Sequence, residues 1–287
     1  MGRWEIAGGK GFSPALVLTC GLAALSTYVV TRILVESGHV WFRADLPAIL
    51  GQAFCAVAYV VGWTSCRCAS ALYPRNSPMR LGWLALGTNC VLSVFRHTVL
   101  NPLFEPLAGS TDRVYFLSQT FLFPALTCAL LGLLAIWWGF HRLGLGFRGR
   151  WTDCAGVLVL ATLLTWIFRG YLSHARSGAA AVMILQQLNL VLLLSIGGVG
   201  LMLHHLAMQM GGGRMAVVMR SVAIYALSRS LLTLSQGDRE AYAYLWWVCF
   251  YAAPWVFVFG AAYFCWLAET VRRSIGRQAY WDWKISD

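Results

Sequence analysis

Charged residues are scarce in this sequence, and lysine is almost absent. Only 11% of the 287 residues are charged and 59% are hydrophobic, whereas a soluble domain carries about 25% charged residues. A soluble chain of this composition would expose large apolar patches. The two lysines, Lys10 and Lys284, stand near the chain ends. No lysine within an apolar run can therefore form a Schiff base with retinal.

Reactive motifs are also missing. The sequence contains no HExxH or GxSxG pattern, and no Asp or Glu stands in the middle of an apolar run, which argues against a carboxylate proton relay. Its nine cysteines are scattered, unlike those of a disulfide framework or a zinc site. Its six histidines fall at different depths, so they do not offer the matched axial ligands of a haem. We therefore expect no enzymatic activity and no cofactor.

The net charge of +11 does not indicate a nucleic-acid-binding protein. The basic residues do not form a cluster. They stand between the long apolar runs, where loops must lie, so no continuous basic face is available to a phosphate backbone. We expect no nucleic-acid partner, and membrane lipids as the surroundings of the chain.

Long apolar runs occupy most of the chain, and a helical span needs about 20 such residues. Their pattern predicts an all-α fold, a single polytopic transmembrane helical bundle over residues 1–287. Eight spans are expected, at about 13–34, 45–68, 81–103, 114–140, 152–172, 179–209, 215–235 and 242–270. Gly197, Gly198 and Gly200 in the sixth span suit close contact between helices.

The loop charges predict the orientation of the bundle. With eight spans, six basic residues fall on one side of the membrane, namely Arg32, Arg43, Arg113, Arg169, Arg176 and Arg239. Apart from two arginines within spans, the other 14 basic residues fall on the side of the chain ends. We therefore expect both the N-terminus and the C-terminus on the cytoplasm-like side.

Two arginines interrupt the apolar spans. Arg96 and Arg229 each lie about two-thirds along a predicted span, where a charge costs about 2.5–3.5 kcal/mol on insertion scales. Asn89 precedes Arg96 by seven positions and Tyr225 precedes Arg229 by four, so each pair shares a helix face. We expect both arginines to face the interior of the bundle, in its outer half.

A candidate ligand-binding set gathers the polar side chains of similar depth. Its members are Arg96, His97, Arg229, Asn89, Gln119, Gln186 and Tyr225. They would line a polar chamber open to the outside, where a guanidinium pair suits a lipid phosphate or another anion. The alternative is that the amides, including Gln52 and Asn189, hydrogen-bond between helices and brace the bundle, and that Arg96 snorkels to the interface.

Two stretches carry spaced residues that resemble a known family. The first is YFLSQTFLFPALTCALLGLLAIWWGFHR, with matching positions at Tyr115, Gln119, Pro124 and Ala125. The second runs from Arg220 to Pro254, with matching positions at Arg229, Gly237, Glu240, Tyr244 and Pro254. Together they resemble the fungal lipid-translocating exporters, the RTA-like multidrug and sterol-resistance family. That family has seven spans, whereas eight are expected here, and it has an Asp before the proline that this chain lacks. The resemblance implies a role in handling lipids or amphiphiles.

These observations favour a multi-pass membrane protein that transports or handles lipids or amphiphiles, with an anionic or amphiphilic small molecule as its ligand. Two alternatives stay open. The short loops, the 14 tryptophans and the absence of a catalytic set equally suit a non-catalytic subunit with partners in a larger membrane complex. A chemosensory receptor with a ligand site in the bundle is the other.

Overall fold

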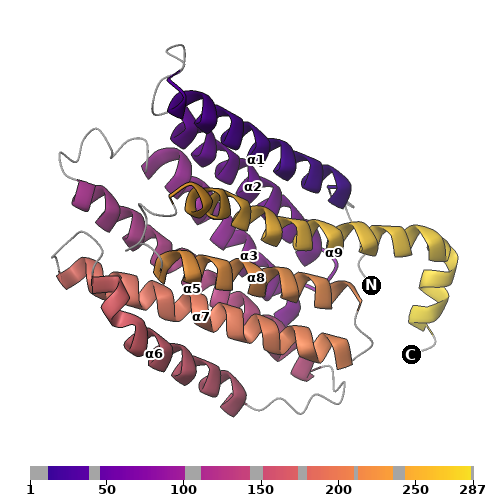
Figure 1. Cartoon of the computed structure of the whole chain (residues 1–287). Helices are drawn as coiled ribbons and strands as arrows, with labels where there is room; N and C mark the ends of the chain where they lie inside the picture. The colour runs from indigo at the N-terminus through magenta and orange to yellow at the C-terminus, as the bar shows by residue number, and fades with distance from the viewer. Residues whose placement is uncertain are drawn as a thin grey trace.

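The computed structural model describes residues 12–38, 46–100, 111–142, 151–173, 180–209, 213–234 and 243–285. These residues form α-helices and one π-helix, with no strand in the described ranges, which confirms the all-α fold (Figure 1). The elements are α1 (Pro14–Glu36), α2 (Leu46–Ser70), α3 (Pro78–Phe95), η1 (Arg96–Leu100), α5 (Thr111–Arg142), α6 (Trp151–Ser173), α7 (Ala180–Gln209), α8 (Arg214–Leu234) and α9 (Ala243–Ile285).

Local chemistry explains several helix ends. Ser77 precedes α3, and its hydroxyl accepts a hydrogen bond from the backbone N–H of Met79 at 3.2 Å. Pro78 then occupies the first turn, where a missing N–H has no consequence. Gly38, just after α1, and Gly213, just before α8, both have a φ of +78°, a left-handed conformation that glycine adopts without strain.

Seven of the helices are long and apolar enough to cross a membrane. The third predicted span differs from the helix observed there. Instead of a uniform span at 81–103, α3 begins at Pro78, contains Arg80 and gives way at Arg96 to η1. One further boundary also differs. α9 continues beyond residue 270, past the bundle, where it bends (Figure 1).

Six helices form a closed ring. In order around it, each packing on the next, they are α2, α3, α5, α7, α8 and α9, and α9 packs again on α2. α1 lies outside the ring against α2 and α9, and α6 lies outside it against α7 and α8. The beginning of α1 and the end of α9 lie at the same end of the bundle (Figure 1).

Glycines allow two of these helix pairs to approach closely. A Cβ at Gly132 on α5 would lie 2.9 Å from the carbonyl oxygen of Gly82 on α3. A Cβ at Gly200 on α7 would lie 3.3 Å from the backbone nitrogen of Ala223 on α8. The second contact confirms the prediction of close packing at the glycines of the sixth span. Small residues serve this purpose in membrane bundles, where burial in lipid does not drive helices together.

The outward faces of the helices are apolar. Leu22 on α1 is 57% exposed, and Trp166 and Ile167 on α6 are 64% and 67% exposed. In water such a surface would cause aggregation, whereas hydrocarbon solvates it. The architecture is therefore that of a multi-pass integral membrane protein.

Candidate functional site

A buried cluster of polar and aromatic side chains lies where α2, η1, α8 and α9 meet. Arg96 and His97 come from η1, and Arg229 comes from α8, with exposed fractions of 5%, 2% and 6%. The π-helix changes the register of the chain at this point, and such turns are frequent at functional sites. The prediction that both arginines face the interior is confirmed.

His97 is held on both of its ring nitrogens. Its Nδ1 hydrogen-bonds to Oε1 of Gln52 on α2, and its Nε2 lies 3.5 Å from Nη2 of Arg96. The ring stacks on Tyr59 with centroids 5.7 Å apart, and it meets Phe250 of α9 edge-on at 6.5 Å. These contacts fix the position and the plane of the imidazole.

Within the described part of the chain, Arg229 is positioned by an aromatic ring and not by a carboxylate. Its guanidinium carbon lies 4.0 Å from the centroid of Phe250, a cation–π contact that contributes about 0.5–2 kcal/mol. One turn earlier on α8, the hydroxyl of Tyr225 lies 2.9 Å from that of Tyr59 in a buried hydrogen bond. α8 thereby presents both predicted residues, Arg229 and Tyr225, to the same cluster.

The two guanidinium groups repel each other through space. Nε of Arg96 and Nη1 of Arg229 are buried without a hydrogen-bond partner. Within the described ranges, the ion pair between side chains is that of Arg32 with Glu36, so no described carboxylate compensates the two charges. Buried cations need such compensation, and the forked donors of a guanidinium group are the chemical complement of a phosphate, sulfate or carboxylate.

A second polar contact joins α5 to α7. Nδ2 of Asn189 donates to the backbone oxygen of Gln119 at 3.1 Å and to its Oε1 at 2.9 Å. Gln186 lies one turn before Asn189 and is 1% exposed. Gln119 was predicted to line the polar chamber with the arginines, and in the structure it accepts hydrogen bonds from Asn189. This contact corresponds to the alternative expectation, in which the amides hydrogen-bond between helices and brace the bundle.

Asn89 is the remaining member of the predicted set. It is buried on α3, on the face expected for it, but within the described part of the chain no hydrogen bond connects it to Arg96. The polar chamber also differs from the expectation, because Arg96, His97 and Arg229 are shielded.

Tyr59 and Phe250 belong to the cluster but not to the predicted set. A sequence signal existed for the first, because Gln52, Cys55 and Tyr59 are spaced as one helix face. The apolar run around Phe250 gave no such sequence signal, since an aromatic residue in a span usually faces lipid or packs in the core.

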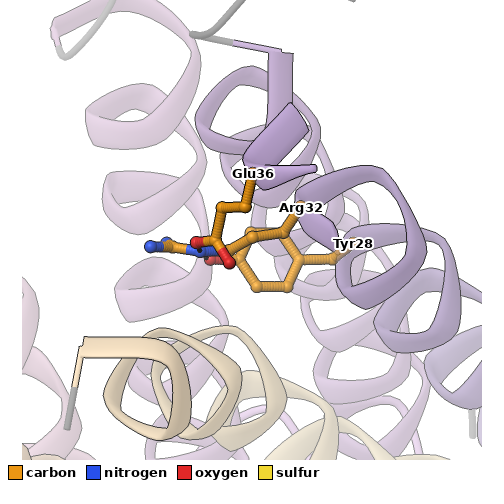
Figure 2. Close-up of polar contacts among 3 residues, drawn as sticks. All are labelled: Tyr28, Arg32 and Glu36. Carbon is orange, nitrogen blue, oxygen red and sulfur yellow. Dashed lines mark hydrogen bonds and ion pairs between the residues drawn. The ribbon is translucent and has the colours of Figure 1, made fainter. Parts of the chain in front are cut away.

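A rim of aromatic contacts extends from the cluster to α1. Phe250 meets Tyr251 edge-on at 5.3 Å, and Tyr251 meets Tyr28 at 4.8 Å. Figure 2 shows Tyr28, Arg32 and Glu36 on successive turns of α1. Nη1 of Arg32 donates to the hydroxyl of Tyr28 at 3.2 Å, and its Nε donates to Oε1 of Glu36 at 2.7 Å. Arg32 is therefore paired with a carboxylate, whereas among the described residues no carboxylate pairs with Arg96 or Arg229.

No metal centre is evident in the described ranges, where no three His, Cys, Asp or Glu side chains come together as a ligand set. His204 hydrogen-bonds through Nδ1 to the backbone oxygen of Ala216 at 2.9 Å, far along α7 from the cluster.

Comparison with protein-family models, with curated proteins and with solved structures finds no match for this chain. Its function is therefore inferred from the chemistry of the buried cluster.

Proposed function

We propose that this membrane protein binds the anionic group of a small molecule or an amphiphile between Arg96 and Arg229, in the course of transport or lipid handling. The observation that carries the proposal is the pair of buried, mutually repelling guanidinium groups, each with an N–H that has no partner. An anion would satisfy both N–H groups and offset the repulsion.

The surroundings support recognition of an oxyanion. A guanidinium group presents a planar fork of donors that matches two oxygens of a phosphate, sulfate or carboxylate. Phe250 and the Tyr59–Tyr225 pair add aromatic surface beside the charges, which suits the apolar part of an amphiphile. The resemblance to the lipid-translocating exporters agrees with such a ligand.

The place of the cluster in the bundle supports handling within the membrane. Arg96 and Arg229 lie near the ends of α3 and α8, and Gln52 and Phe250 lie near the beginnings of α2 and α9, at one end of an antiparallel bundle. With the chain ends on the cytoplasm-like side, that end is the outer half. The headgroup of an outer-leaflet amphiphile would lie at a similar depth.

Binding measurements on the full-length protein in mild detergent test the proposal. Calorimetry with inorganic sulfate and with decyl sulfate separates a free oxyanion from the headgroup of an amphiphile, since only the second offers a chain. We expect Arg96→Gln and Arg229→Gln each to weaken binding about ten- to hundredfold, because each removes a charged hydrogen bond of about 1.5–3 kcal/mol.

Arg220→Gln is the matched control, because Arg220 lies on α8 with Arg229 but is exposed, so its loss should leave binding unchanged. The proposal is wrong if the wild-type protein binds neither probe and the two arginine variants lose only thermal stability. That result would show that the arginines merely brace the bundle. Fixed partner proteins after purification would favour the subunit alternative.

A further inference from the structure

We propose that His97 takes up a proton when an anion binds beside Arg96 and Arg229, so that anion and proton bind together. The inference rests on the proposed function, and it adds a proton as the second ligand of the same site. Three features of the cluster carry it: the hydrogen bonds of the imidazole, the charges around it, and the lack of an acid in the described residues that face it.

The hydrogen bonds assign the resting state of His97. The amide oxygen Oε1 of Gln52 can only accept a hydrogen bond, so Nδ1 of His97 is the donor. Nη2 of Arg96 can only donate, so Nε2, 3.5 Å away, faces it with a lone pair. His97 is therefore a neutral imidazole with its proton on Nδ1, and Nε2 is the atom that would accept another proton.

The charges oppose that second proton while the arginines are alone. Arg96 and Arg229 both repel a positive charge on His97, and they repel each other. A protonated His97 would be a third positive charge in a buried place, where such repulsion is poorly screened. A dianion between the guanidinium groups cancels two charges, so the same proton becomes tolerable and Nε2 is free to donate to the anion.

The described groups that face the cluster from other helices do not supply a counter-charge for the proton on His97. α2 contributes Gln52, Cys55 and Tyr59, α8 contributes Tyr225 and Arg229, and α9 contributes Phe250. On α5, which also packs on η1, the first titratable side chain within residues 116–142 is Cys128. Among these described groups none is an acid, so the anion itself is the natural counter-charge.

Coupling of this kind is reciprocal: if the anion favours the proton, a higher proton concentration favours the anion. For transport it means that a dianion enters the membrane accompanied by a proton. The charge that crosses is then smaller, which matters because each elementary charge is worth about 2.3 kcal/mol per 100 mV.

The pH dependence of sulfate and decyl sulfate binding tests the inference. Both probes keep a constant charge from about pH 5 to 8, the interval in which a histidine titrates. We expect binding to tighten as the pH falls, by up to about tenfold per pH unit, the limit for one linked proton. For His97→Asn, whose amide N–H₂ can still donate to Gln52, we expect binding that is independent of pH.

His205→Asn is the matched control, because His205 is exposed and hydrogen-bonds to Gln209 at the other end of the bundle; it should keep the wild-type pH dependence. Calorimetry of the wild-type protein in buffers with different heats of ionisation counts the protons directly, whether or not the variant folds. An uptake of up to one proton per anion supports the inference. Binding without proton uptake, or an unchanged pH dependence in His97→Asn, overturns it and leaves the anion site standing, whereas no binding at any pH overturns both.

Discussion

At the residue scale, the sequence predicted burial better than it predicted partners. Arg96 and Arg229 were placed correctly because a charge in an apolar span has few low-energy positions, and an interior position is one of them. Their neighbours were harder to predict. Gln119 accepts a hydrogen bond from Asn189. Any nearby amide or backbone carbonyl satisfies an amide equally well, and the sequence carries no information on which of them is nearest in space.

Tyr59 and Tyr225 offer a direct test of how firmly the cluster is held. Their hydroxyls form a buried hydrogen bond of 2.9 Å between α2 and α8. Tyr59→Phe and Tyr225→Phe should each lower the free energy of unfolding by about 1 kcal/mol, because each leaves a buried hydroxyl without its partner. The double variant should cost less than the sum, with a coupling of about 0.6 kcal/mol, typical of membrane proteins.

Unfolding of the detergent-solubilised protein by titration with sodium dodecyl sulfate would measure these effects. Tyr263→Phe is the control, because Tyr263 is half-buried, stacks on Phe259 at 6.3 Å and has no hydrogen bond in the described part of the chain. Strict additivity of the two substitutions would mean that the hydroxyl pair contributes nothing to stability.

At the scale of the helices, hydropathy located most of the spans but not their internal irregularities. Seven helices match apolar runs because lipid leaves little choice for such segments. α3 lacks such a long apolar window because it carries Arg80 and Asn89, and it gives way to a π turn at Arg96. A π turn depends on how neighbouring helices hold the backbone, so hydrophobic periodicity does not reveal it.

Gly82 and Gly132 should be essential for the packing of α3 on α5. Gly132→Ala would place a Cβ 2.9 Å from the backbone oxygen of Gly82, and a backbone atom cannot rotate away. We expect a loss of about 1–3 kcal/mol in the free energy of unfolding, the range seen for overpacked interiors, measured by the same titration.

Gly156→Ala supplies the contrast. Gly156 also stands inside a helix, α6, but a Cβ there meets nothing within 4 Å. Alanine is the better helix former by about 1 kcal/mol, so this variant should be neutral or slightly more stable. Equal losses at Gly132 and Gly156 would contradict the close approach of α3 and α5.

At the scale of the whole molecule, eight antiparallel helices bring the beginning of α1 and the end of α9 to the same end of the bundle (Figure 1). The bundle alone does not say which end faces the cytoplasm-like side, and for this the loop charges of the sequence supply an expectation. Most loop arginines lie on the side of the chain ends, and basic loops stay on the cytoplasmic side of a membrane. The buried cluster, near the opposite end, then lies in the outer half.

Protease protection in sealed inside-out vesicles checks this arrangement. Epitope tags at the N-terminus and the C-terminus should be digested together, because an even number of crossings returns the chain to its starting side. The informative case is α3, the helix with Arg80 and without a long apolar window. If α3 failed to cross, seven spans would separate the tags, and one would be digested while the other stayed protected. Arg96 and Arg229 would then no longer lie at the same depth, near the ends of two helices that run in the same direction, so the paired cluster itself requires that both tags behave alike.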